Sequence, residues 1–197
     1  MGPTDEELVE AFRAGDLAAF DVLVRRWERK IQGAIHRILG REEDARDLCQ
    51  ETFLKAYRAL GSFKGEARFS SWLYQIALNL CRDRMRRTKG KAVVSLTEAE
   101  EGGTGLEMAS GRPSALDLVL AGDLARAVAE AVASLPEEQR EVIVLKEYQE
   151  LTFVEIALVL GVPLSTVKTR LYRGLGQLRL HLERQGIRRA APVPAAL

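Results

Sequence analysis

Cysteine and histidine are nearly absent from this sequence, which holds only Cys49, Cys81, His36 and His181 among its 197 residues. No two of them stand at the spacing of metal ligands, so neither a zinc site nor a disulfide framework is indicated. Both cysteines fall on apolar helical stripes, where buried free thiols of a reducing compartment are the ordinary outcome. The sequence therefore predicts no metal and no cofactor.

Long apolar runs and a leader segment are missing as well. No stretch approaches the roughly 18 apolar residues that a membrane-spanning helix needs. Residues 1–10 lack the basic segment and apolar core of a secretion signal. We therefore expect a soluble, cytoplasmic protein without membrane insertion.

The sequence also lacks a strong net charge, since the formal value is only +1. The distribution of charge is uneven, however. Residues 82–91 hold six basic side chains and one acid, and residues 168–189 hold seven basic side chains and one acid. Between them, residues 96–123 hold six acids and one arginine. Two basic blocks separated by an acidic middle favour two nucleic-acid contacts in one chain.

Apolar residues recur at three- and four-residue steps almost throughout, which predicts an all-α protein. The expected helices are Asp16–Leu39, Glu42–Leu60, Ser71–Arg87, a helix from Ser114 that ends at Leu135–Pro136, Glu137–Glu147, Thr152–Leu160 and a last helix from Ser165. Periodicity disappears between Lys91 and Pro113, where glycines and acids predict a flexible linker. We expect an N-terminal domain at 1–90, a linker at 91–113, a second domain at 114–185 and a tail at 186–197.

The segment Thr152–Arg170 predicts a helix-turn-helix. Gly161 suits the left-handed turn, and Ser165 or Thr166 is the expected cap of the second helix, whose Val167 and Leu171 would face inward. The expected outer face consists of Ser165, Thr166, Lys168, Thr169, Tyr172 and Arg173, whose cations and hydroxyls suit phosphates and guanine edges. The alternative is an ordinary helical hairpin with a solvated basic face.

Residues 69–87 place aromatic rings at the start of a helix and arginines at its end. This pattern combines surfaces for base stacking with surfaces for phosphate contact. Alternatively, Trp72 and Tyr74 belong to the core, and the arginine run is simply the solvent-exposed end of the helix.

The helix expected at Glu42–Leu60 carries an unusual polar face, made of Asp47, Gln50, Glu51 and Leu54. A leucine among polar residues is either the anchor of a protein contact or an ordinary exposed side chain. A nuclease would need the acids Glu42, Glu43, Asp44, Asp47 and Glu51 as metal ligands. Successive residues on a helix point in different directions, so this cluster makes a poor metal cage.

These three segments, in this order, resemble the extracytoplasmic-function (ECF) group of bacterial sigma factors. The stretch Asp44–Ala56, followed by Tyr57, resembles the helix that docks on the coiled coil of the largest polymerase subunit. The resemblance implies a role in that contact for Asp47, Gln50, Glu51 and Leu54. It also implies core RNA polymerase and promoter DNA, both duplex and single-stranded, as partners, and an anti-sigma factor is a common further partner in the group.

Residues 69–87 resemble the promoter-melting helix of the group, and residues 61–70 resemble its loop that captures a flipped base of the minus-ten element. The implied minus-ten residues are Phe63, Lys64, Arg68, Phe69, Trp72, Asn79, Arg82 and Arg86. In the loop, Phe63 and Phe69 would supply apolar walls, and Lys64 and Arg68 would contact phosphate.

Residues 135–145 and the helix-turn-helix resemble the domain that reads the minus-thirty-five element. The implied readers are Lys168, Thr169, Arg170, Tyr172 and Arg173, with Ser165 and Thr166 at the entry to the helix. Two features depart from the group: Ser165 replaces a usual glycine, and Gly174 and Gly176 interrupt a helix-favouring stretch. Each glycine costs about 1 kcal/mol relative to alanine, so the last turns of this helix are the weakest part of the match.

The expected function is that of a sigma factor, which directs polymerase to promoters, helps to melt them and is not an enzyme. The alternative of a stand-alone helix-turn-helix regulator leaves the first domain without a role. A regulator would bind its promoter alone, whereas the free sigma factor should bind poorly. A sequestering interaction protein is disfavoured because it does not need two separate basic blocks.

Overall fold

A computed structural model describes residues 2–65, 67–92 and 115–187 of the chain, and within these ranges every regular element is a helix. The N-terminal helices are α1 (Asp5–Arg13), α2 (Ala18–Leu39), α3 (Glu42–Ala59), the short 3-10 helix η1 (Leu60–Ser62) and α4 (Phe69–Ala92). The C-terminal helices are α5 (Ala115–Ala133), α6 (Glu137–Ile143), the π-helical turn η2 (Val144–Tyr148), α7 (Phe153–Leu160) and α8 (Leu164–Arg184). The all-α prediction is confirmed.

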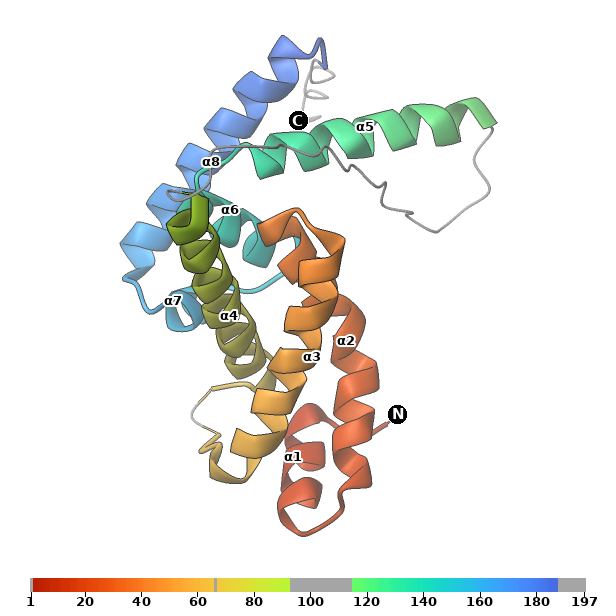
Figure 1. The fold of residues 1–197 in the computed structure, drawn as a ribbon, viewed down its shortest axis with the longest axis vertical. Coiled ribbons are helices and arrows are strands. Elements are labelled where there is room, and N and C mark those ends of the chain that lie inside the picture. Colours follow the sequence, from red (N-terminus) through yellow and green to blue (C-terminus); the bar gives the residue numbers. More distant parts are fainter. Residues whose placement is uncertain (1, 66, 93–114, 188–197) are drawn as a thin grey trace, which may run out of the picture.

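Helices α1 to α4 form a bundle (Figure 1), in which apolar side chains of each helix are buried. On α2, Ile31, Ile35 and Ile38 are almost completely buried. One face of α3 and the start of η1 are also buried, through Ala45, Leu48, Cys49, Thr52, Phe53, Ala56 and Leu60. Full burial of one such aliphatic side chain stabilises a fold by about 1.5–3 kcal/mol. The buried polar Thr52 donates its hydroxyl to the carbonyl of Leu48, which removes the cost of burying it.

Helix α1 was not among the expected elements, although its start carries a readable signal. The Thr4 side chain accepts from the Glu7 amide, and the Glu7 side chain accepts from the Thr4 amide, so the two form a capping box. Asp5 then accepts from Trp27 Nε1 at 2.9 Å and pairs with Arg26 on α2. These contacts attach α1 to the side of α2.

The cap of α2 was expected at Asp16, one residue before the position where the structure places it. Leu17 stands at the cap position of α2 and makes no side-chain cap hydrogen bond. Asp16 Oδ1 instead accepts from the Ala18 amide at 3.0 Å, so its side chain stabilises the turn that precedes the helix.

The helix-turn-helix is present as predicted between α7 and α8. Thr152 and Glu155 form a capping box at the start of α7, and Gly161 ends this helix in the left-handed region at φ 66°. Val167 and Leu171 on α8 are buried, as predicted. The expected cap is wrong: Pro163 precedes α8 and presets its entry, so Ser165 lies inside the first turn of the helix.

The two glycines of α8 do not interrupt the helix, which continues to Arg184. Gly174 is buried where α8 crosses α6, and a Cβ atom there would lie 3.2 Å from Ile143 Cγ1 and 3.4 Å from Gln139 Cβ. Its missing side chain lets the two helices approach closely. Gly176, two residues later, faces open space. The expectation that both glycines weaken the match is therefore corrected, because one of them serves packing.

The C-terminal helices pack directly on the N-terminal bundle. Helix α2 contacts α5, α6 and η2, and α4 contacts α7 (Figure 1). The linker expected at 91–113 and the tail expected at 186–197 lie almost entirely outside the described residues.

The two glycines of α8 make a matched pair for a stability measurement. We expect Gly176→Ala to raise the free energy of unfolding by about 1 kcal/mol, because alanine favours the helix and meets no neighbour. Gly174→Ala gains the same propensity but must displace the buried Ile143 side chain, which costs about 1–3 kcal/mol. Urea unfolding should therefore rank Gly176→Ala above the wild type and Gly174→Ala below it. Equal stabilisation by both substitutions would contradict the close helix crossing.

Candidate nucleic-acid and polymerase interfaces

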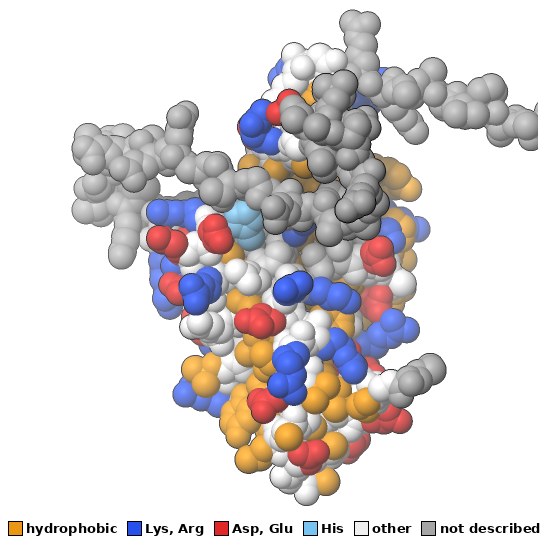
Figure 2. Space-filling view, turned by 90° about the vertical axis from the view of Figure 1, so that its right-hand side faces the viewer, with side chains coloured by type: hydrophobic (Ala, Val, Ile, Leu, Met, Phe, Trp, Pro, Cys, Tyr) orange, Lys and Arg blue, Asp and Glu red, His pale blue; other side chains and the backbone are white. Residues whose placement is uncertain are grey.

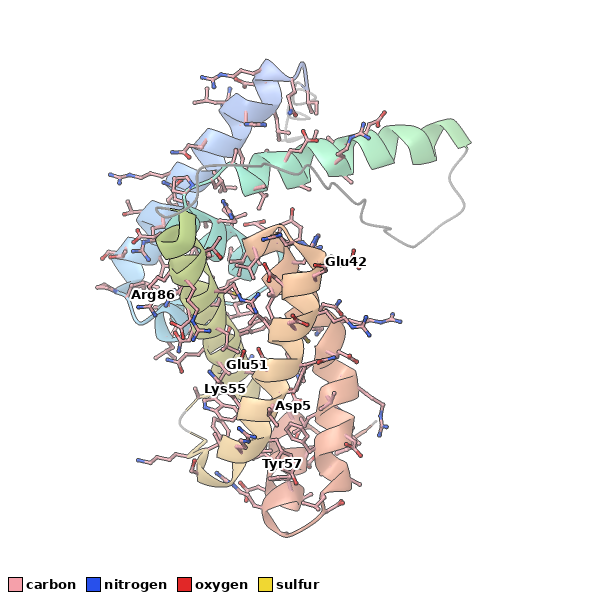
Figure 3. All side chains as sticks on the ribbon, viewed as in Figure 1. Asp5, Glu42, Glu51, Lys55, Tyr57 and Arg86 are labelled. Atoms are coloured by element: carbon pink, nitrogen blue, oxygen red, sulfur yellow. The ribbon has the colours of Figure 1, made fainter. Side chains whose placement is uncertain are left out.

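The polar face predicted on α3 is exposed, and all four of its residues lie on it: Asp47, Gln50, Glu51 and Leu54. The Leu54 side chain is 49% exposed, which is high for a large aliphatic residue. Along the same helix, Glu51 pairs with Lys55 at 3.4 Å. Figure 3 labels both residues, together with Glu42 and Tyr57 of the same helix. The face thus combines acidic and amide groups with one apolar anchor.

The side of the molecule drawn in Figure 2 is mixed rather than uniformly basic. Figure 2 shows basic and acidic side chains next to one another on this side of the molecule, with apolar side chains gathered toward its lower end. A surface that follows a phosphate backbone would be predominantly positive.

The loop at 61–70 rests on an aromatic cluster. The Phe63 ring lies 6.5 Å from Phe69 and 4.9 Å from Trp72, centroid to centroid. Phe69 is completely buried and Phe63 nearly so, whereas Trp72 is half-buried. The expectation that Phe63 and Phe69 form the walls of a base pocket is therefore corrected for this conformation, since neither ring offers a free surface. Instead, the two rings pack beneath the loop and hold it in place.

The polar residues of the loop and of α4 differ in whether their side chains contact the C-terminal helices. Lys64, Asn79 and Arg86 are exposed, and Arg86 pairs with Asp83 on its own helix. Arg68 lies 3.2 Å from Glu155 of α7. Arg82 donates from Nε and Nη2 to the two carboxylate oxygens of Glu141, at 2.8 and 2.7 Å. Two of the three minus-ten arginines predicted from the sequence, Arg68 and Arg82, thus pair with carboxylates of the C-terminal helices.

The recognition helix α8 presents most of its predicted readers to solvent. Ser165, Lys168, Thr169, Tyr172 and Arg173 are exposed. Thr166 and Arg170 are half-buried instead, and Arg170 pairs with Glu138 at 2.8 Å.

An open pocket of about 360 Å³ lies beside α8. Its lining consists of Pro136, Glu138, Gln139, Ser165, Thr166, Thr169, Arg170 and Arg173. Hydroxyls and arginines on one wall of a shallow pocket suit phosphate or a base edge.

Residues that sequence reasoning did not single out connect the two groups of helices. Glu141 binds Arg82, and Gln149 accepts from the Tyr74 hydroxyl at 2.5 Å. Arg140 donates to the Ile38 carbonyl at 2.6 Å, and Arg37 lies over the Tyr148 ring at 4.3 Å. No local motif marks these residues, because each acts on a partner far away in the sequence.

Burial and pairing shift the pKa values at these contacts. The hydrogen bond with Glu141 raises the pKa of Arg82, whereas burial lowers the pKa of Arg140. Burial alone would raise the pKa of Glu155, but hydrogen bonds from Thr152 and the nearby charges of Arg68 and Lys146 outweigh it and lower that pKa. The raised pKa of Arg82 and the lowered pKa of Glu155 both favour the charged forms of these two side chains.

Comparisons with known proteins match the helices that carry these candidate surfaces. Residues 23–91 match the family Sigma-70 region 2, and residues 125–178 match Sigma-70, region 4. The chain is 36% identical over 174 residues to the RNA polymerase sigma-H factor of Pseudomonas aeruginosa, covering 86% of this chain and 89% of that protein. It is 37% identical over 179 residues to the ECF RNA polymerase sigma factor SigW of Bacillus subtilis, covering 88% and 94%. The chain belongs to the ECF group of RNA polymerase sigma factors.

This sigma factor also has a fold known from a solved structure. The sigma factor RpoE of Bartonella quintana, in complex with the anti-sigma factor NepR, matches with a TM-score of 0.70 at 21% identity, covering 83% of this chain and 96% of that one. Region 2 spans α2 to α4, and region 4 begins in α5 and ends in α8. Its function is that of an alternative sigma factor, which directs core polymerase to specific promoters and helps to melt them; a stand-alone regulator is not favoured.

The described part of the sigma factor holds no cluster of three or more side chains suited to a metal ion. Nor is any of its described helices both long and apolar enough to span a bilayer. Both cysteines are buried free thiols, as expected. Burial raises the pKa of Cys49 to about 11 and that of Cys81 to about 12, so neither is an effective nucleophile at neutral pH.

These pKa values predict slow thiol chemistry in the folded sigma factor. A raised pKa means that less thiolate is present at a given pH, about tenfold less for each unit, so labelling by a disulfide reagent at pH 8 should be at least about 100-fold slower than in denaturant. The measurement is the absorbance of the released thiol, with the protein in denaturant as control. Rapid labelling of the native protein would show that these helices open readily.

Proposed function

We propose that the exposed face of α3 is the docking surface for core RNA polymerase. Leu54 is the apolar anchor of this surface, and Asp47, Gln50 and Glu51 surround it with groups that hydrogen bond. Interfaces concentrate their energy in a few buried anchors within a polar rim. The observation that carries the proposal is an exposed leucine on a sigma-factor helix whose opposite face is buried in the core.

The loop at 61–70 and helix α4 act on the separated strand of the minus-ten element. A base taken out of the stack costs a few kcal/mol, which contacts in the protein must offset. Lys64 and Arg68 supply charge for the phosphates, and Asn79, Arg82 and Arg86 extend the surface along α4. The aromatic floor under the loop gives these contacts a preorganised support.

Helix α8 reads the minus-thirty-five element as duplex DNA. Lys168, Thr169, Tyr172 and Arg173 face outward along one side of the helix, which suits insertion into a major groove. Arg170, Ser165 and Thr166 border the adjacent pocket and position the helix on the phosphates.

Two weak DNA contacts on one chain act together once polymerase fixes their distance. We infer domains at 1–90 and 114–185 with a tether at 91–113, whose acids suit a path through a basic channel, and a tail at 186–197. The protein has no catalytic role of its own and acts in the cytoplasm, where polymerase and DNA meet. An anti-sigma factor is a further partner, as the Bartonella complex has for its own sigma factor.

The docking surface can be tested with two exposed leucines. We expect Leu54→Ala combined with Asp47→Ala to weaken binding to core polymerase by about 2–4 kcal/mol, because it removes the anchor and a rim carboxylate. Helical content should not change, since both side chains are exposed. Leu17→Ala, at the 60% exposed turn before α2, is the control and should bind normally. Equal affinities in a pull-down of core enzyme would exclude this face.

Duplex reading and strand trapping should separate by mutation. Arg173→Ala loses a base contact worth about 1–3 kcal/mol, so recruitment to the upstream element should fall. Lys64→Ala should leave closed-complex binding nearly unchanged and reduce strand opening, measured by permanganate reactivity of unpaired thymines. Lys64 is a cleaner choice than Phe63, whose substitution would also open a cavity.

The controls distinguish the two steps. A pre-melted template should rescue Lys64→Ala but not Arg173→Ala. Arg179→Ala removes an exposed arginine farther along α8, outside the reading positions, and should recruit like the wild type. If Lys64→Ala behaves on pre-melted DNA as it does on duplex, the loop does not trap a strand.

A further inference from the structure

The reading surface of α8 has an acidic neighbour on another helix. Glu138 lies in the first turn of α6, and its Oε2 stands 2.8 Å from Nη2 of Arg170 on α8. The two side chains differ in exposure, since that of Glu138 is 68% exposed and that of Arg170 only 19%. The carboxylate is therefore the more accessible group of the pair, and the arginine is largely enclosed behind it.

Both residues line the open pocket beside α8, together with the proposed readers Thr169 and Arg173. Among the residues of this lining, Glu138 is the acid and the two arginines are the cations. A DNA phosphate that approaches Arg170 through the pocket therefore comes close to a carboxylate as well. The two negative charges repel, and they repel more strongly beside a protein surface than in bulk water because the effective dielectric constant is lower.

The pairing does not remove Arg170 from the reading surface. The ion pair uses Nη2, whereas a guanidinium carries several further N–H donors. Arg170 can therefore donate to a phosphate while it keeps its carboxylate partner. Such a phosphate must approach from a direction that avoids Glu138, so the acid restricts which positions of the DNA backbone are favourable.

We propose that Glu138 is a specificity-determining residue of the reading surface, which holds Arg170 in the pocket wall and repels phosphates that approach it out of register. This inference rests on the function proposed for α8. On DNA of arbitrary sequence, binding relies on phosphate contacts in many registers, so the carboxylate lowers affinity there. At the correct element, base contacts such as that of Arg173 fix one register, in which the phosphates avoid the carboxylate. Glu138 thus weakens binding to wrong sequences more than binding to the right one.

The test compares two pools of DNA bound by the holoenzyme, reconstituted from core polymerase and the full chain. One pool consists of short duplexes with a randomised centre, and the other is the same pool after enrichment by the wild-type holoenzyme. Binding is measured by fluorescence anisotropy in the cold, where the duplexes stay closed, with core polymerase alone as the blank. The ratio of the two affinities gives the specificity, and the salt dependence of each affinity reports the number of phosphate contacts.

Glu138→Gln removes the charge and keeps an oxygen that can accept from Arg170. It should bind the unselected pool at least about threefold more tightly than the wild type, and the enriched pool within about twofold, so that specificity falls. Its salt dependence on the unselected pool should steepen by about one phosphate contact, because Arg170 is no longer neutralised. Glu138→Asp keeps the charge and should retain the specificity of the wild type.

Two further variants assign the effect to this ion pair. Glu183→Gln removes the same charge from an exposed pair farther along α8, and it should change the affinity for neither pool. Arg170→Gln, added to Glu138→Gln, should remove most of the gain on the unselected pool, because the gain acts through the released guanidinium. A gain that persists without Arg170 would contradict the proposal.

A purely structural role of Glu138 gives a different result. Acids in the first turn of a helix favour it through the helix dipole, and Glu138 occupies such a position in α6. If this is its whole role, Glu138→Gln should melt at a lower temperature, with specificity and salt dependence unchanged. That outcome would overturn the proposal. Circular dichroism checks that the variant folds, which we expect because the Glu138 side chain is mostly exposed.

Failure of this inference and failure of the proposed function are distinguished by Arg173→Ala. If the Arg173→Ala holoenzyme prefers the enriched pool as strongly as the wild type does, α8 does not read the element, and both proposals fail. If Arg173→Ala loses this preference while Glu138→Gln keeps the specificity of the wild type, only the role of Glu138 is wrong.

Discussion

The burial of α2 is the constraint on which the rest of this structure depends. Helix α2 contacts α1, α3 and α4 in the bundle, and also α5, α6 and η2 of the C-terminal helices. Its apolar face is buried from Phe20 to Ile38, and the Ile38 carbonyl in its last turn accepts a hydrogen bond from Arg140. Since α2 is enclosed on so many sides, we place the functional surfaces on other helices. The proposed docking and melting surfaces lie on its neighbours α3 and α4, and the proposed reading face lies on α8, which packs on α5, α6 and α7.

Arginine serves two purposes in this molecule. On exposed faces, as at Arg173, a guanidinium is available for DNA. Between the helix groups, Arg82 and Arg140 bind a carboxylate and backbone carbonyls in largely enclosed positions. A planar cation with several donors can exchange a carboxylate for a phosphate without changing its geometry. The same residue type therefore serves internal contacts at Arg82 and Arg140 and is exposed to solvent at Arg173.

Aromatic residues show how a position can look functional in the sequence and yet act through packing. Phe63 and Phe69 flank a polar loop in the sequence, which suggested walls for a base. The structure turns both rings inward against Trp72, so the loop gains a rigid base. Burial of a phenyl ring is worth more than its exposure beside charged groups, and nothing in the local pattern distinguishes the two orientations.

The sequence alone determined the helical architecture, the helix-turn-helix, the exposed face of α3 and the family, because each follows from local periodicity or from a motif within one segment. Tertiary structure decided the rest. Gly174 is a breaker in a helical pattern, and only the crossing with Ile143 shows that it permits close packing. Glu141 is an ordinary acid on an amphipathic helix until Arg82, 59 residues away, is brought to it. Such long-range pairs depend on how helices are arranged in space, and helical periodicity fixes which face is buried without naming the partner that buries it.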